Sequence, residues 1–351
     1  MRITRIVAYS LATGKAEMSF IKSMVLIFII GVMIVSCGKT DENNTINRIV
    51  YGLTLEPSGI DPHINQSSEL GIVLRSVYDT LIYRDPETRE FVPGLAESWM
   101  ISEDGLLYTF NLRQDVSFHD DTPFNAQAVA TNLDRILDPD SASQRSRFML
   151  GSFAGYTIVD DYTIQLALTE PFAPLLDSLS QVYLAIASPS ALAEYSRNRY
   201  QFHQVGTGPF EFVEYIPGDQ IVIRRSSEYT WAPSFYDAIT ENSVEEIVFR
   251  FYRDEATRLL ALESGDVDIM GELPPTDARN LSGTTQIRLI PAIVPGQPLQ
   301  FLFNTEVFPT DNLAVRQALL IGTNRGAITD TVFQGFSPMA WAPLSESTLF
   351  Y

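Results

Sequence analysis

Apolar and polar residues alternate in several stretches of the chain in the manner of β-strands. Within 106–113, Tyr108, Phe110 and Leu112 would lie on one side of a strand and polar residues on the other, because successive side chains of a strand point to opposite faces. Residues 158–168 contain two such runs around an acidic turn, which predicts a strand–turn–strand unit. Further apolar runs predict strands at 49–55, 221–226, 247–252 and 267–270.

Apolar residues at helical spacing predict five helices. In the first, which follows Ser67 or Ser68 as a possible cap, they are Leu70, Val73, Leu74, Val77 and Leu81. Asn125 would cap a second helix, and Asp254 a third that ends at Gly265. Two more helices are expected at 311–320 and 325–334. Helices and strands alternate without a strict βαβ rhythm, which favours an α/β or mixed α+β fold.

The N-terminal part has the pattern of an export signal. Lys22 precedes the apolar run at 24–36, and a basic head before a short apolar run is typical of a secretory signal peptide. A membrane span needs roughly 20 apolar residues, so this run is too short to be one. We therefore expect residues 1–36 to be a signal peptide, with Met18 as the more natural start.

The chain contains one cysteine, Cys37, directly after this run. The sequence Ile34-Val35-Ser36-Cys37 resembles the bacterial lipoprotein box, in which the thiol is lipidated and becomes the new N-terminus. The alternative is a plain signal peptide with a chance cysteine. Residues 38–47 are polar and would form, with Cys37, a lipidated tether at 37–47. A single cysteine excludes an internal disulfide.

Charge and motifs exclude several functions. The chain has 43 Asp and Glu against 24 Lys and Arg, a net charge of −19, whereas a nucleic-acid-binding protein shows a basic patch. The run His119-Asp120-Asp121 is interpreted as structural rather than as a metal site, because the side chains of neighbouring residues point apart. The turn at 206–209 is interpreted as structural rather than as a phosphate-binding loop, because no Lys-Ser/Thr follows its glycines. We expect no metal, no cofactor and no enzymatic activity.

Four stretches, in this order, resemble the bacterial extracellular solute-binding proteins of family 5, the oligopeptide-, dipeptide- and nickel-binding components of ABC importers. They are 93–129, 205–229, 253–270 and 303–335. The first carries the elements Ala96, Trp99, Asp104-Gly105, Tyr108-Thr109-Phe110, Leu112-Arg113 and Phe118-His119-Asp120. One departure is Asp121, where the family commonly has Gly before Thr-Pro, and this puts the tightness of that turn in question.

The resemblance implies a periplasmic-binding-protein-like fold of type II, with lobes that close about a hinge. It implies capture of a peptide or similar solute outside the cell and its delivery to an ABC permease and ATPase. We expect a monomer that the lipid on Cys37 anchors to the outer face of the cytoplasmic membrane, or that is located in the periplasm. Within the same fold the ligand could be a sugar, a nickel chelate or haem. A lipoprotein receptor that signals to a membrane partner is a different possibility.

The resemblance also implies a domain organisation. The first lobe would be discontinuous, with a second lobe inserted in it and the start of a third lobe at the end. Family members run well beyond this length, so we expect an N-terminal portion of a longer protein with an incomplete third lobe, against the alternative of a real short form. The expected parts after residue 47 are 48–84 with 196–296, the insert 85–195, and 297–351.

Candidate ligand contacts follow from the position of loops. The loop from Glu56 through Pro57 to His63 follows the first strand, where the family's first lobe faces the cleft. Tyr229 and Trp231 lie beyond the second strand pair. Each of these five residues could equally be a surface or core residue.

Overall fold

The structure, a computed structural model, describes residues 47–67, 69–236, 243–292 and 294–348. It has a mixed α/β architecture, which confirms the predicted fold class. The strands are β1 (Arg48–Leu53), β2 (Ile82–Arg84), β3 (Phe91–Pro93), β4 (Ala96–Ile101), β5 (Leu107–Leu112), β6 (Phe153–Asp160), β7 (Thr163–Leu168), β8 (Phe210–Ile216), β9 (Gln220–Arg225), β10 (Glu246–Phe251) and β11 (Ile269–Met270).

The α-helices differ widely in length, and only three of those described reach ten residues. They are α2 (Glu69–Leu74), α3 (Ala126–Leu137), α4 (Gln144–Met149), α5 (Leu175–Leu179), α6 (Pro189–Glu194), α7 (Arg197–Tyr200), α8 (Glu255–Ser264), α9 (Pro275–Leu281), α10 (Leu313–Gly322) and α11 (Arg325–Val332). Short 3₁₀ turns occupy Pro139–Ser141 and Val182–Leu184.

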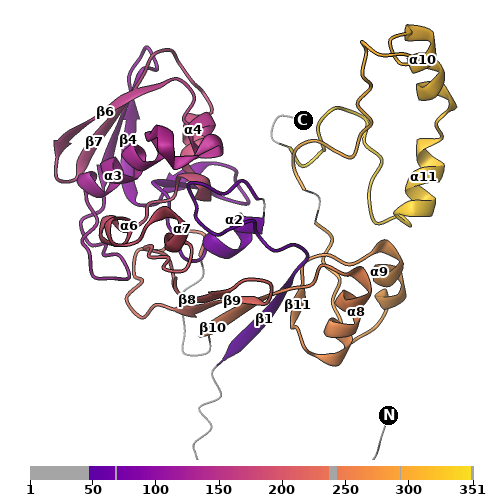
Figure 1. Ribbon diagram of the computed structural model, residues 1–351, viewed down its shortest axis with the longest axis horizontal. Helices are drawn as coiled ribbons and strands as arrows, with labels where there is room; N and C mark the ends of the chain where they lie inside the picture. Colours follow the sequence, from indigo (N-terminus) through magenta and orange to yellow (C-terminus); the bar gives the residue numbers. More distant parts are fainter. Residues whose placement is uncertain (1–46, 68, 237–242, 293, 349–351) are drawn as a thin grey trace, which may run out of the picture. The chain divides into compact units, whose positions relative to one another are not determined.

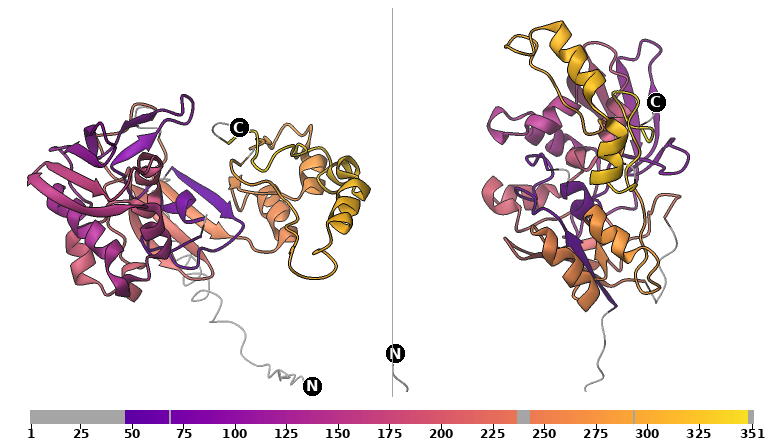
Figure 2. Two further views of the ribbon diagram at one scale, coloured as in Figure 1. Left: turned by 90° about the horizontal axis from the view of Figure 1, so that it is seen from above. Right: turned by 90° about the vertical axis from the view of Figure 1, so that its right-hand side faces the viewer.

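A five-stranded sheet joins β1 to a segment about 200 residues later in the chain, in the order β11-β1-β10-β9-β8. β1 runs parallel to β10 and β11, whereas β9 is antiparallel to both β10 and β8. Figures 1 and 2 show the indigo β1 beside the orange strands. Leu53, Ile223 and Phe249 are buried in the core on this sheet, together with Val77 and Tyr183. Residues distant in sequence therefore share one core.

A second, four-stranded antiparallel sheet has the order β4-β5-β7-β6 (Figure 1). The alternation predicted for β5 is confirmed, since Tyr108, Phe110 and Leu112 are all buried. The predicted strand–turn–strand unit is the β6–β7 pair. Leu133 and Ile136 of α3 pack in the same core as these strands.

The predicted caps of α3 and α8 are confirmed. The Asn125 side chain accepts a hydrogen bond from the backbone N–H of Ala128 at 2.9 Å. Asp254 caps α8 in the same way, and Gly265 ends α8 with φ of +78°, in the left-handed region that glycine adopts without steric cost. Local side-chain chemistry thus fixes where these helices begin and where α8 ends.

The first predicted helix was wrong in length, because α2 ends at Leu74. Val77 and Leu81 lie beyond it, yet both are completely or almost completely buried. The backbone carbonyls of Ser76 and Val77 accept hydrogen bonds from Phe210 and Gly208 instead of from a next helical turn. Helical spacing of apolar residues was here a consequence of burial rather than of a continuous helix.

Asp121 occupies the position where the resemblance leads one to expect glycine, and its φ is +62°. The left-handed turn is therefore kept with an aspartate, a residue that tolerates this conformation better than most. Its backbone N–H donates to the carbonyl of Phe118 at 2.9 Å, which closes the turn.

Helices α10 and α11 contain no buried residue. Asn312 and Asn324 nevertheless cap them. Among all helices of the described ranges, none combines the length and the apolar content needed to cross a bilayer.

Candidate functional site

The three parallel strands β1, β10 and β11 end at the same edge of their sheet. In open α/β sheets, ligands bind outside the carboxyl ends of the strands. Glu56 follows β1 at this edge, and its side chain is only 10% exposed. Its Oε1 accepts hydrogen bonds from the Tyr215 hydroxyl at 2.9 Å and from the Gly218 N–H at 2.7 Å. Its Oε2 pairs with Arg253, whose side chain is 68% exposed. The Glu56 carboxylate thus ties the β8–β9 turn to the end of β10.

Pro57 and His63, further along the same loop, are both buried. His63 Nε2 donates to the carbonyl of Ala185 at 2.8 Å, since a carbonyl oxygen can only accept. Its Nδ1 consequently accepts from Arg135 Nη1 at 2.7 Å. Burial, and then the nearby Arg135 charge, lower the pKa of His63 to about 4, so the imidazole is neutral at pH 7.

Arg135 of α3 reaches this loop and forms a buried ion pair with Asp61. Its Nη1 donates to Asp61 Oδ1 at 2.9 Å, and its guanidinium lies over the Tyr200 ring at 5.2 Å. Asp61 Oδ1 also accepts from the backbone N–H of His63 at 3.0 Å. Breaking a buried ion pair by removing one partner typically costs ~3–5 kcal/mol, because a charge is left unpaired.

Tyr229 and Trp231 lie together, with their rings edge to face at 5.2 Å. Both are buried, and both donate to the carboxylate of Asp79. The Tyr229 hydroxyl lies 3.2 Å from Oδ1, and Trp231 Nε1 lies 2.9 Å from Oδ2. The Thr207 hydroxyl at 3.0 Å and the Tyr83 hydroxyl complete four donors to this carboxylate.

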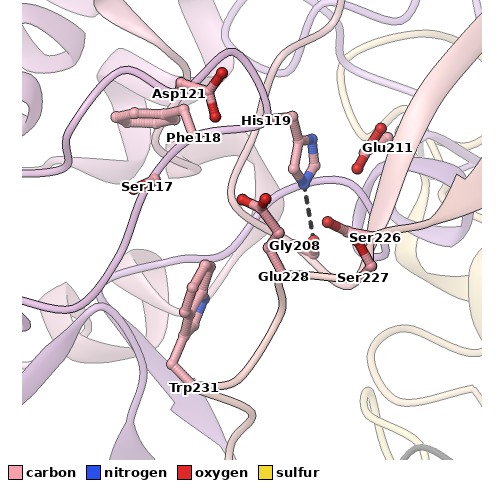
Figure 3. A pocket seen from close by; sticks show the side chains of 10 residues that line it. All are labelled: Ser117, Phe118, His119, Asp121, Gly208, Glu211, Ser226, Ser227, Glu228 and Trp231. Carbon is pink, nitrogen blue, oxygen red and sulfur yellow. Dashed lines mark hydrogen bonds between the residues drawn. The ribbon is translucent and has the colours of Figure 1, made fainter.

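One face of Trp231 lines a small polar pocket of about 100 Å³ (Figure 3). The pocket is bounded by the 117–121 turn, the start of β8 and the loop after β9. Its lining residues are Ser117, Phe118, His119, Asp121, Gly208, Glu211, Ser226, Ser227, Glu228 and Trp231. A ligand of peptide size needs a larger cavity, since such sites measure roughly 300–1,000 Å³.

The glycine-rich turn and the histidine run identified in the sequence meet at this pocket. His119 Nε2 donates to the Gly208 carbonyl at 2.9 Å, as the dashed line in Figure 3 shows. A Cβ on Gly206 would lie 2.1 Å from the Val77 carbonyl oxygen, and one on Gly208 would lie 2.6 Å from that of Ser76. Both positions therefore require glycine, and both motifs form a structural junction here.

The five predicted contacts do not form one cluster. Glu56 and Pro57 belong to the edge of the five-stranded sheet, His63 is buried against α3, and only Trp231 reaches the pocket. Their role as ligand contacts stays a prediction, and Cys37 lies outside the described residues. Across the described ranges, no group of three or more His, Cys, Asp and Glu side chains is arranged to hold a metal ion.

The sequence reasoning missed Asp79 and Arg135. Each is a charged residue inside a predicted apolar helical pattern, and that position is a signal of a buried charge with specific partners. Arg135 lies between Leu133 and Ile136, and Asp79 lies between Val77 and Leu81.

Comparison with known proteins identifies the family. A sequence profile described as "Bacterial extracellular solute-binding proteins, family 5 Middle" matches residues 90–351. The glutathione-binding protein GsiB of Pectobacterium atrosepticum is 32% identical over 293 residues, which are 83% of this chain and 54% of that protein. GsiB of an Escherichia coli strain is 30% identical over 320 residues, or 91% of this chain and 59% of the relative. The chain thus spans little more than half the length of these relatives.

Solved structures show the same fold. The periplasmic binding protein DppA of Helicobacter pylori, in complex with the peptide STSA, has a TM-score of 0.69 and 26% identity, covering 86% of this chain and 61% of that one. NikA of Brucella suis, in complex with Fe(III)-EDTA, has a TM-score of 0.70 and 25% identity, covering 86% and 59%. These neighbours confirm the type II periplasmic-binding-protein fold. The chain belongs to the bacterial extracellular solute-binding proteins of family 5.

Proposed function

We propose that this chain captures short peptides or similar solutes outside the cytoplasm and delivers them to the permease and ATPase of an ABC importer. The observation that carries the proposal is the family match over residues 90–351, together with relatives named as glutathione-binding proteins. Glutathione is itself a small peptide. The DppA structure holds a peptide as well.

The ligand would bind at the carboxyl ends of β1, β10 and β11. There Glu56 holds the exposed Arg253, whose guanidinium can pair with a ligand carboxylate. Glu56 would act by fixing this arginine rather than by touching the ligand, because its two oxygens already accept from three protein donors.

The division into lobes is part of this proposal. Residues 48–84 with 196–296 form the first lobe, 85–195 the second, and 297–351 the start of a third. The two sheets support it, since the five-stranded sheet draws only on the first set and the four-stranded sheet only on the second. Closure about a hinge would bury the ligand between lobes.

We further propose that Cys37 carries a lipid and anchors a monomeric protein to the membrane. Support comes from its position after a signal-like apolar run. The test is Cys37→Ala in a bacterial host, which should release the protein from membranes and remove a lipid-sized mass. A variant that still partitions with membranes and keeps that mass would contradict the anchor.

Two other functions remain as alternatives. Within the fold, the ligand could be a sugar, a haem or a metal chelate such as a nickel chelate, and the NikA complex with Fe(III)-EDTA favours the last of these. A signalling receptor would lack permease and ATPase genes beside its own. We propose no catalysis, since the named relatives are binding proteins.

A thermal-shift screen tests the ligand class. A ligand at about 100 times its Kd stabilises the folded state by about 2.7 kcal/mol, so glutathione or dipeptides should raise the melting temperature. Arg253→Gln should abolish the rise, whereas Arg250→Gln, a change at a half-buried arginine inside β10, serves as the matched control. A rise with sugars or nickel chelates and none with peptides would contradict the proposal.

A further inference from the structure

Asp79 is a buried carboxylate that no step of solute binding uses. It is 1% exposed, and the free energy of burying an ionised carboxylate is strongly unfavourable unless donors surround it. Here four side chains donate to it: Tyr83, Thr207, Tyr229 and Trp231. We call these five residues the Asp79 cluster.

The donors come from three separate parts of the chain. Tyr83 lies in β2, Thr207 in the glycine-rich turn before β8, and the two aromatic residues in the segment after β9. Tyr229 and Trp231 belong to no helix or strand. No sheet ladder therefore sets the position of their rings.

One of the four donors can act in no other way. An indole N–H can only donate, and it lies 2.9 Å from Oδ2, which also accepts from Thr207. Oδ1 accepts from the two tyrosine hydroxyls. The hydroxyls of Tyr83, Thr207 and Tyr229 can donate or accept, so the indole N–H is the one group of the cluster that depends on a side-chain oxygen of Asp79.

The Trp231 side chain takes part in both the Asp79 cluster and the pocket wall. Its Nε1 is bound to Asp79, and the side chain is one of those that line the polar pocket, as His119 and Glu228 also do (Figure 3). We propose that Asp79 is the positioning residue of this pocket: its carboxylate fixes Trp231 at the pocket wall, and it also holds Tyr229, which packs against Trp231. This assignment is independent of the proposed transport function.

The indole N–H signal of Trp231 in a ¹⁵N NMR spectrum tests the proposal. The chain has three tryptophans, so the signals are few, and Trp231→Phe assigns the relevant one. In Asp79→Ala, this signal should move upfield and its hydrogen should exchange about tenfold faster, because no side-chain oxygen is left to accept from the buried indole N–H. The signals of Trp99 and Trp341 should stay in place.

Thr207→Val is the matched control, since it removes one donor from the carboxylate but leaves the bond to Trp231. Its Trp231 signal should keep the native position and exchange rate. The proposal is overturned if Asp79→Ala leaves the Trp231 signal native, or if Thr207→Val moves it as far.

The unchanged protein gives a second test that does not depend on a folded variant. Trp341 is 66% exposed, whereas Trp231 is 8% exposed. The Trp231 indole hydrogen should exchange far more slowly than that of Trp341. Equal rates would overturn the proposal, because an indole bound to a buried carboxylate cannot exchange freely.

Discussion

Helices α3 and α10 begin with the same kind of cap but differ in how many of their residues are buried. Each is capped by an asparagine that accepts from a backbone N–H at 2.9 Å, Asn125 in α3 and Asn312 in α10. Seven residues of α3 are buried, and none of α10 is. Yet α10 has the higher proportion of apolar residues. Capping and composition therefore specify a helix, whereas burial depends on what packs against it.

The two helices should also differ in what they contribute to the free energy of unfolding. Most helical stability in proteins comes from packing of an apolar face rather than from intrinsic propensity. The core around α3 also contains buried charge in specific contacts, such as the Arg135–Asp61 pair. We expect global unfolding to report on α3 and its neighbours and to be nearly insensitive to α10.

Matched leucine truncations should show the largest contrast. Leu133 in α3 is 4% exposed and Leu320 in α10 is 68% exposed. Leu133→Ala should lower the free energy of unfolding by ~2–5 kcal/mol, because it leaves a cavity. Leu320→Ala should change it by less than about 0.5 kcal/mol. Urea unfolding of both variants measures the difference, and equal effects would contradict the comparison.

The pH dependence of stability should reveal the buried His63. Its pKa is about 4 in the folded protein and 6.5 for the unperturbed group. Below pH 6.5 the unfolded chain gains a proton that the folded chain does not accept until about pH 4. Stability should therefore fall by about 3 kcal/mol as the pH decreases across this range.

His63→Gln provides the control for this pH effect. Glutamine offers a donor for Ala185 and an acceptor for Arg135 but does not titrate. Urea unfolding at a series of pH values should show that the variant lacks this part of the slope. An unchanged slope in the variant would mean that another group is responsible.

Local patterns predicted much of the fold. The alternation in β5, the caps Asn125 and Asp254 and the family resemblance were all confirmed. The alternation and the caps act within a few residues of chain. The end of α2 depends instead on hydrogen bonds from Gly208 and Phe210, over 130 residues away, which no local pattern contains.

The site was harder to predict for the same reason. The Asp79 cluster and the Arg135–His63 contact join segments that are far apart in sequence. Their position beyond the second strand pair suggested Tyr229 and Trp231, but their carboxylate partner could not be identified without the fold. The expected role of Pro57 as a ligand contact remains a prediction, and Glu56 is proposed to act through Arg253 instead.

Removing the caps of α3 and α10 should give a smaller difference in the free energy of unfolding than the two leucine truncations. Asn125→Ala should destabilise the protein by ~1 kcal/mol, because an N–H at the start of a buried helix loses its acceptor. Asn312→Ala loses the same bond but should leave global unfolding unchanged and reduce only the helical circular dichroism. A global loss of similar size in both variants would show that α10 takes part in the cooperative core.

The smallest expected effect is at the Asp121 turn. Asp121 has φ of +62° and is exposed. Asp121→Gly removes the steric cost of this conformation and adds a smaller entropic one, so the protein should gain about 0.5 kcal/mol. Asp120→Gly is the control and should not stabilise. Thermal unfolding measures both, and a destabilised Asp121→Gly would mean that the carboxylate has a role beyond the turn.

Hydrogen exchange along the chain tests the central contrast most directly. The amides of α3 should exchange only through global unfolding, because its apolar face is buried. Those of α10 and α11 should exchange orders of magnitude faster in the same sample, since neither helix has a buried residue. Equal and strong protection of the three helices would contradict the account, because it would require a packed partner for α10 and α11.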